Sequence, residues 1–435
     1  MVNAKLGLAC CLLLLPFNVV AQEAAPSPQP ADLSLEQAET IAVANQPRLL
    51  AEQLRARAYA QRVREARAGF QPMVAFNATG ALAADTGTAT AAGALTTSSL
   101  SDRFAYGGNL TQLVTDFGRT SALVQSTRYQ AAAEADLATL TKAQVRLNVR
   151  EAYYGTLGAE AVLRAAQAAQ QNRHLISHQL ETLAQNELRS TLDVNFAKVL
   201  ESEAELAVVR AQSMVAQERS RLATAMGQQQ SVGSHLIEPV TPGAVPAAPE
   251  EIMAEAQTQR ADLSAAQARE KAAQEFASSE KRLSYPSLNV LGAAGQLPYH
   301  DHTLHDSYAA AGFSLNIPVF NGGLFAARRT EAELEASART RDTAALRLEV
   351  NQQVRDAWSR ADEAYRSLDV TARLVAQSKE ALRLAQDRYD AGLGSIVELN
   401  EAQLNETSAE ISAADATYTY LSRRAELDFA AGLLN

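Results

Sequence analysis

Residues Val149-Arg150-Glu151-Ala152-Tyr153 are nearly repeated 205 positions later as Val354-Arg355-Asp356-Ala357-Trp358. The same offset relates Ser190-Thr191-Leu192-Asp193-Val194 to Ser395-Ile396-Val397-Glu398-Leu399, and it carries Gly227 onto Gly432. A fixed offset held across much of a chain indicates that one structural unit is written twice. We therefore predict one repeat at 22–227 and a second at 251–435. They are joined by a linker at 228–250, which holds four of the 13 prolines.

Long helices are predicted to dominate both repeats. By count 87 of the 435 residues are Ala, while aromatic residues make up 6%; this composition is typical of long helices rather than of a mixed α/β fold. The expected helices of repeat one are 34–68, 120–188 and 193–226, and those of repeat two are 250–282, 324–389 and 398–431. Each longest helix would be a rod of about 100 Å. Its apolar residues recur every three or four positions, which predicts coiled-coil neighbours.

Strand-like runs precede each long helix. Large apolar and small or polar residues alternate in 104–113 and 309–319, and shorter runs around 74–76 and 288–290 show the same period of two. Such runs suit membrane β-strands. Phe313, Leu315 and Ile317 would then face lipid, and Ser314 and Asn316 the lumen. Four strands cannot close a barrel, so several chains must supply one together. Small-residue loops at 86–99 and 300–306 would lie outside the cell.

The first 21 residues read as a secretory signal peptide, because Lys5 precedes a short apolar run that ends in Val19-Val20-Ala21. Both cysteines, Cys10 and Cys11, lie within it, so we expect a mature chain without thiols and without a lipid-attachment cysteine. No later apolar run is long enough for a transmembrane helix. The formal net charge is −10 with no compensating basic block, so nucleic acid is not an expected partner.

The sequence resembles the TolC-like outer membrane efflux family, also called outer membrane factors. The resemblance rests on 114–119 (Val-Thr-Asp-Phe-Gly-Arg), on 319–323 (Val-Phe-Asn-Gly-Gly) and on the turn 389–399. It implies a mainly α protein with membrane β-structure, in which a homotrimer forms a 12-stranded β-barrel continued by a periplasmic α-helical coiled-coil barrel. It further implies a passive exit duct in the outer membrane of a Gram-negative cell, with no catalytic residues and no cofactor. Its partners would be outer membrane lipid, a periplasmic adaptor and an inner-membrane pump of the RND or ABC type.

The family's periplasmic tip is expected at the two turns that share the Ser-x-x-acidic pattern. The resemblance places a gate at Arg189, Asp193, Tyr389, Gly394, Glu398 and Glu401. It places an adaptor-contact surface at Ser190, Thr191, Leu192, Gly392, Leu393 and Ser395. The chain departs from the family at Gly394, where an arginine is expected, while an arginine does occur in repeat one as Arg189. Glu398 and Glu401 share one helix face, either as an entrance ring that attracts cations or as carboxylates that favour the helix N-terminus.

Other polar residues give weaker indications of a site. His300, His302 and His305 form a tract of a kind that binds metal, but we favour solvated loop histidines as its explanation. His174 and His178 lie one helical turn apart without a third ligand nearby in sequence. No catalytic motif is found, so we expect no enzyme. The competing functions are a type I protein secretion duct, and a periplasmic coiled-coil adaptor or structural envelope protein without a pore.

Overall fold

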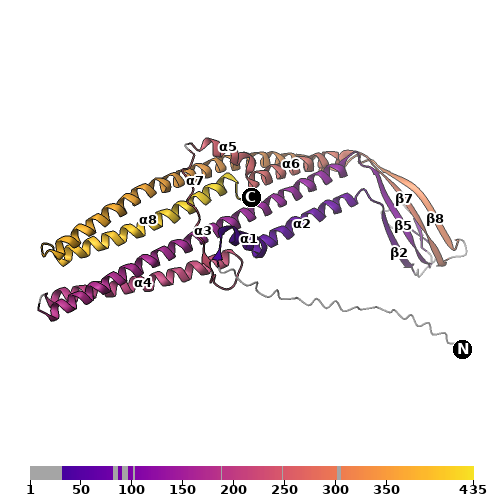
Figure 1. The fold of residues 1–435 in the computed structure, drawn as a ribbon. Coiled ribbons are helices and arrows are strands. Elements are labelled where there is room, and N and C mark those ends of the chain that lie inside the picture. The colour runs from indigo at the N-terminus through magenta and orange to yellow at the C-terminus, as the bar shows by residue number, and fades with distance from the viewer. Residues whose placement is uncertain are drawn as a thin grey trace, which may run out of the picture.

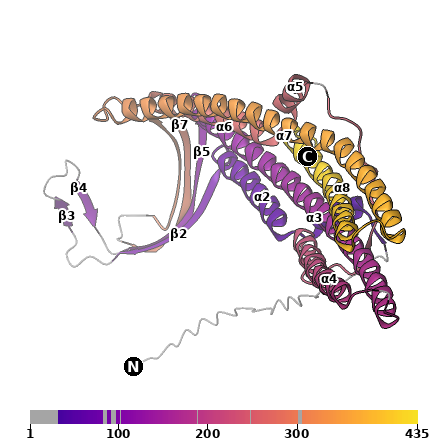
Figure 2. The same ribbon diagram turned by 90° about the vertical axis from the view of Figure 1, so that its left-hand side faces the viewer.

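The chain forms a long bundle of helices with a curved sheet at one end (Figure 1). This computed structural model describes residues 32–81, 87–90, 97–100, 103–187, 189–246, 248–300 and 305–435. The expected signal peptide at 1–21 lies outside the described residues. Figure 2 shows that the strands turn away from the helical bundle, with a small β3–β4 hairpin beyond them.

The two halves contain the same order of main elements. The first half comprises β1 (Asp32–Leu33), α1 (Leu35–Asn45), α2 (Pro47–Ala68), β2 (Met73–Ala81), β3 (Gly87–Thr90), β4 (Thr97–Leu100), β5 (Arg103–Thr115), α3 (Arg119–Gln185) and α4 (Thr191–Ala225). The second half comprises β6 (His235–Leu236), α5 (Glu250–Gln259), α6 (Ala261–Lys281), the 3₁₀ turn η1 (Arg282–Ser284), β7 (Ser287–Tyr299), β8 (Ser307–Asn316), α7 (Leu324–Asp390) and α8 (Ile396–Ala431).

The long helices agree with the sequence prediction to within a few residues. Both α3 and α7 contain 67 residues, which corresponds to about 100 Å each. Shortly after the last residues of α4 and α8 come Gly227 and Gly432, whose φ values of 72° and 83° lie in the left-handed region that stops helices. Ser34 caps α1 in the expected capping box with Gln37.

Three sequence predictions of local structure need correction. The expected first helices at 34–68 and 250–282 are each broken in two, because Gln46 and Arg260 adopt extended backbone conformations. Gln46 precedes Pro47, and the proline ring disfavours helical backbone in the residue before it. The segment 86–99 is not wholly loop, since β3 and β4 pair antiparallel within it. The strand expected at 309–319 ends at Asn316, just before Ile317-Pro318, where proline lacks the N–H that a strand ladder needs.

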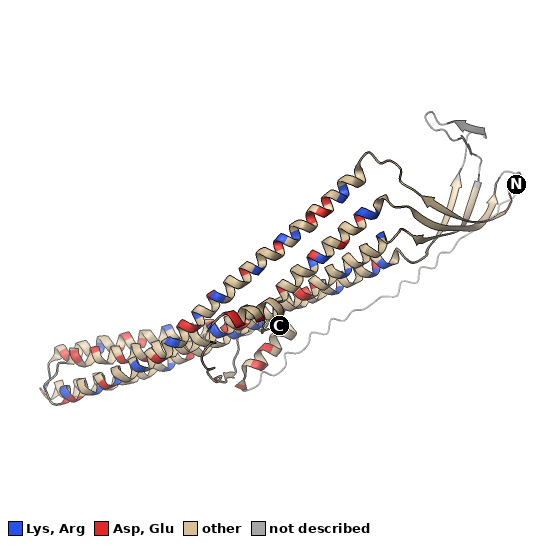
Figure 3. Cartoon of the chain, turned by 90° about the horizontal axis from the view of Figure 1, so that it is seen from above, with Lys and Arg blue, Asp and Glu red and all other residues tan. Residues whose placement is uncertain are grey.

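The sheet is antiparallel, with strand order β2-β5-β7-β8. Its register places Val74 opposite Leu110, Val290 opposite Phe313, and Leu288 opposite Leu315. Opposed residues point to the same face of a sheet, so these pairs place a row of large apolar side chains on one face. Met73 and Leu291, which align with each other through Thr111, lie on the other face. Strands β2, β7 and β8 contain no charged residue. Both signs of charge are interspersed along the helices (Figure 3).

The predicted linker is a structured strap around the middle of the bundle. Its β6 pairs parallel with β1, and the carbonyl of Ile237 accepts a hydrogen bond of 2.7 Å from the Tyr153 hydroxyl. The equivalent residue in the second half, Trp358, donates to the carbonyl of Pro246 at 2.8 Å. The two halves therefore hold the strap through the same position of each long helix. Among the residues that the structure describes, no helix is both long and apolar enough to cross a lipid bilayer.

Candidate functional site at the helical tip

The tip of the bundle is formed by the two turns that join α3 to α4 and α7 to α8. Ser190 caps α4, its hydroxyl accepting a hydrogen bond from the Leu192 N–H at 3.1 Å. Ser395 caps α8 in the same way, accepting from the Glu398 N–H at 3.2 Å. These caps satisfy N–H groups that the first helical turn leaves unpaired. The shared Ser-x-x-acidic pattern thus produces the same local structure twice.

A small apolar cluster joins the two helical hairpins behind these turns. We call it the tip cluster, and it comprises Leu180, Ala197, Ala385, Tyr389, Ile396 and Leu399. Its members come from α3, α4, α7 and α8. Only 9% of Tyr389 is exposed. The tip cluster therefore makes the two hairpins a single packed unit at this end.

Arg189 crosses from the first turn to the second hairpin. Its guanidinium carbon lies 4.7 Å from the centroid of the Tyr389 ring, a cation–π geometry. The Tyr389 hydroxyl is buried, and no residue of the described chain accepts or donates a hydrogen bond to it. Burial raises the pKa of the Tyr389 phenol above its ordinary value; Asp193 and Asp390 raise it further, while Arg189 opposes them. The phenol is therefore neutral at physiological pH.

Two acidic residues of the tip, Glu398 and Glu401, are exposed and do not contact Arg189. Glu398 is exposed and lies 3.4 Å from the Nε of Arg388, so its ion pair is made within its own hairpin rather than with Arg189. Glu401 is also exposed on the first part of α8. Sequence reasoning missed Arg388; its place in the last turn of α7, where cations favour the helix C-terminus, is the signal that could have found it.

Gly394 occupies a crowded position. A Cβ atom built there would lie 3.2 Å from the Tyr389 nitrogen and 3.3 Å from the Arg388 carbonyl carbon. The N–H groups of Leu393 and Gly394 both donate to the Arg388 carbonyl, at 2.9 and 3.0 Å. Leu192 and Leu393, two of the expected adaptor-contact residues, are 61% and 75% exposed. The turns therefore present apolar side chains to solvent while Gly394 stays tucked against the end of α7.

The remaining candidates do not gather into a site. His174 Nδ1 lies 2.6 Å from Glu201 on α4, and His300 Nε2 lies 2.9 Å from Asp306. Residue 302 lies outside the described residues. Within the described ranges, no group of three or more His, Cys, Asp or Glu residues has the arrangement of a metal site.

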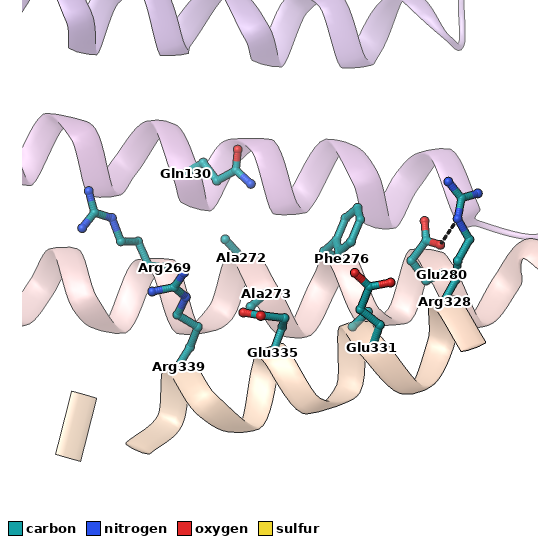
Figure 4. Close-up of a pocket in the computed structure, with 11 residues that line it drawn as sticks. Gln130, Arg269, Ala272, Ala273, Phe276, Glu280, Arg328, Glu331, Glu335 and Arg339 are labelled. Atoms are coloured by element: carbon teal, nitrogen blue, oxygen red, sulfur yellow. Dashed lines mark ion pairs between the residues drawn. The ribbon is translucent and has the colours of Figure 1, made fainter. Parts of the chain in front are cut away.

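A charged cavity lies elsewhere, between α3, α6 and α7 (Figure 4). It has a volume of about 570 Å³. Three arginines and three glutamates line it: Arg269, Arg328, Arg339, Glu280, Glu331 and Glu335. Because these charges balance, the cavity favours neither a cation nor an anion.

Known proteins support the resemblance drawn from the sequence. Residues 252–433 match the family model described as outer membrane efflux protein. The outer membrane protein TolC of Escherichia coli K12 is 24% identical over 152 residues, which are 35% of this chain and 30% of TolC. The TolC of Salmonella enteritidis is 23% identical over 28% of this chain and 25% of that protein. The chain thus aligns with less than a third of these relatives' length.

Solved structures match over nearly the whole chain. CusC superposes with a TM-score of 0.79 at 18% identity, covering 92% of both chains. The outer membrane protein VceC of Vibrio cholerae gives a TM-score of 0.76 at 19% identity, covering 92% of this chain and 96% of VceC. At these identities the structural matches establish a shared fold. The resemblance to TolC-like outer membrane efflux proteins, which are channel proteins rather than enzymes, is confirmed.

Proposed function

We propose that this chain, a relative of the TolC-like outer membrane efflux proteins, is the outer-membrane exit duct of a tripartite efflux or type I secretion system. Three copies form a 12-stranded β-barrel, and their helices continue it as a tunnel into the periplasm. Transport through the duct is passive. Substrates are delivered by an inner-membrane pump of the RND or ABC type through a periplasmic adaptor.

The open sheet is the observation that carries this proposal. Strands β2 and β8 are its edges, and unpaired strand edges are normally covered, charged or closed into a barrel. Strand lengths of 9, 13, 13 and 10 residues suit tilted membrane strands. One face collects Val74, Phe76, Phe313 and Leu315, which are 55% to 76% exposed. Pairing β8 of one copy with β2 of the next would cover both edges and turn this apolar face toward lipid.

The helical tip is proposed as the gated entrance and adaptor contact. Two contacts would keep the resting entrance closed: the Arg189 guanidinium against the Tyr389 ring, and the ion pair of Arg388 with Glu398. The other proposed gate residues are Asp193, Gly394 and Glu401. Ser190, Thr191, Leu192, Gly392, Leu393 and Ser395 would contact the adaptor. The proposal keeps a cleaved signal at 1–21, repeats at 22–227 and 251–435, and a linker at 228–250. A pore-free adaptor or structural protein is less well supported, because it would not need an open sheet that exposes a row of large apolar side chains.

Planar-bilayer recording of the purified protein tests the duct. We expect trimers from the outer-membrane fraction that form cation-preferring pores. Arg189→Ser should raise the resting conductance, whereas the double variant Glu398→Gln, Glu401→Gln should weaken cation selectivity and block by trivalent cations. Leu315→Arg, on the apolar face, should abolish insertion, whereas Asn316→Arg, on the other face, should be tolerated. A protein that extracts without detergent and forms no pore would contradict the proposal.

A further inference from the structure

We propose that the end of the helical bundle next to the sheet binds the headgroups of anionic phospholipids in the membrane leaflet that faces the periplasm. The binding surface is formed by exposed cations on α2, α3 and α6. We call them the basic collar, and they are Arg62, Arg64, Arg67, Arg119 and Lys281. The inference rests on the proposed outer-membrane duct and names the class of lipid that the duct prefers.

The balance of charge reverses between the two ends of the bundle. Over the eight residues nearest the sheet, α2, α3, α6 and α7 together carry seven Lys and Arg residues and four Glu residues. Over the eight residues nearest the tip, α3, α4, α7 and α8 carry three cations and six carboxylates. The whole chain has 39 Lys and Arg against 49 Asp and Glu, so the sheet end is basic in an acidic protein. Figure 3 shows Lys and Arg residues at the helix ends that meet the strands.

The cations of the basic collar are available to a ligand. In the part of the chain that the structure describes, no acidic oxygen lies within 4.0 Å of any of the five. The Arg62 guanidinium lies 4.1 Å from the centroid of the Tyr59 ring, a contact that leaves its N–H edge free to donate. At the tip, by contrast, the three cations counted above all form ion pairs with carboxylates of their own hairpin. Only the sheet end therefore offers positive charge that the described chain leaves uncompensated.

An exposed aromatic residue marks each of the four junctions between the sheet and a helix. In chain order these residues are Phe70, Phe117, Tyr285 and Phe320, and they are 44% to 90% exposed. The rings of Phe117 and Tyr285 meet edge to face, with centroids 6.4 Å apart. Aromatic residues of membrane proteins gather where the hydrocarbon meets the headgroups. The basic collar lies two to eight residues beyond these aromatic residues, within about 12 Å along a helix, which is the level of the lipid phosphates.

Neighbouring helices supply cations to the same part of this surface. The end of α2 touches the start of α3, since a Cβ atom at Gly69 would lie 3.2 Å from the Thr120 side chain. Arg67 and Arg119 flank this contact. The planar guanidinium of arginine donates two parallel hydrogen bonds to a phosphate. A zwitterionic headgroup brings an ammonium with each phosphate, so an excess of fixed positive charge favours lipids of net negative charge, such as phosphatidylglycerol.

Thermal unfolding of the purified protein in detergent tests the basic collar. We expect dioleoyl phosphatidylglycerol, added to the micelles, to raise the unfolding midpoint by about 3 °C or more, because a ligand that binds the folded state stabilises it. The same amount of dioleoyl phosphatidylcholine should give less than about a third of this shift. Sodium chloride at about 0.5 M should remove more than half of the phosphatidylglycerol effect, because salt screens exposed charges. Inorganic phosphate at the same concentration as the lipid should give no shift, since it lacks the acyl chains that cover the apolar sheet face.

Two triple variants of equal charge locate the effect. Arg64→Gln with Arg67→Gln and Arg119→Gln should lose at least half of the phosphatidylglycerol shift and keep the unfolding midpoint of the unmodified protein in detergent alone. The matched control is Arg341→Gln with Arg347→Gln and Arg355→Gln. It removes three exposed cations of α7 that lie 17 to 31 residues from the start of that helix, about 26 to 47 Å along it. This control should keep the full shift.

The outcomes separate the basic collar from the proposed duct. Equal shifts with the two phospholipids, or an equal loss in both triple variants, would overturn the basic collar. The duct would stand as long as the protein forms pores in planar bilayers of phosphatidylcholine. A shift produced by inorganic phosphate alone would overturn the assignment to lipid and indicate a general anion site. A protein that forms no pore in bilayers of either lipid would contradict the duct itself.

Discussion

Two turns of similar backbone shape close the tip, but they are built from different residues. In the first half Glu187 adopts a φ of 61°, and the equivalent residue of the second half, Gly392, adopts 74°. Two positions later the first half has Arg189, which reaches across to Tyr389, while the second half has Gly394, where a Cβ atom would lie only 3.2–3.3 Å from its neighbours. The two turns share left-handed residues at equivalent positions, but only the turn of the first half carries a side chain, Arg189, that contacts the other hairpin.

The junctions between strand and long helix differ in the same manner. Phe117 and Gly118 have φ values of 55° and 88°, and their equivalents Gly322 and Gly323 have 63° and 84°. In the first half the Asp116 carboxylate accepts hydrogen bonds from the Gly118 and Thr120 N–H groups, at 3.1 and 2.7 Å. At this junction the first half therefore has one glycine supported by the Asp116 side chain, and the second half has glycine at both left-handed positions.

The largest difference between the halves is expected where each long helix holds the strap. Tyr153 is fully buried, and its hydroxyl contacts the carbonyls of Leu33 and Ile237, whereas Trp358 is half-buried and contacts one carbonyl. Tyr153→Ala should lower the free energy of unfolding by about 3–5 kcal/mol, and Trp358→Ala by clearly less. Denaturant unfolding followed by circular dichroism measures both. Equal losses would mean that the strap is held alike in the two halves.

An exchange at the tip should have a smaller effect of predictable sign. An L-residue in the left-handed region costs about 1–2 kcal/mol, so Gly392→Ala should destabilise the second hairpin by that amount. Glu187→Gly should stabilise the first hairpin by up to about 1 kcal/mol. Hydrogen exchange of the amides next to each turn reports these changes locally. If Glu187→Gly made its turn open more readily, the Glu187 side chain would have a role beyond its backbone conformation.

The sequence predicted the regular parts of the molecule better than its contacts. The long helices follow from apolar spacing and from terminal glycines, which are local signals. The break at Arg260 is not marked by a proline in the sequence. The Arg260 guanidinium donates to Asp262 at 2.9 Å, a local bond, and to the Gln353 side chain at 2.7 Å, a contact that exists only after α6 and α7 pack. At the tip, the resemblance singled out Arg189 and Tyr389, but their stacking depends on the tip cluster, which joins residues about 200 positions apart.

The smallest expected change in stability is that of Tyr389→Phe, which tests the hydroxyl of Tyr389 apart from its ring. Tyr389→Phe keeps the ring that Arg189 contacts and removes a buried hydroxyl without a described partner, so stability at neutral pH should change by less than about 1 kcal/mol or rise slightly. Because burial raises the pKa of Tyr389, the folded state holds its phenolic proton more tightly than the unfolded chain does. This contribution to stability is present below the ordinary pKa of tyrosine and is lost as the pH rises through the folded value.

Tip opening at alkaline pH, measured by hydrogen exchange near residue 389, should therefore be weaker in Tyr389→Phe than in the unmodified protein. Tyr389→Leu is the control, because it also removes the ring and should loosen the Arg189 contact at every pH. Identical alkaline opening in the unmodified protein and Tyr389→Phe would assign the effect to other buried phenols, such as Tyr153, whose pKa burial raises to about 12.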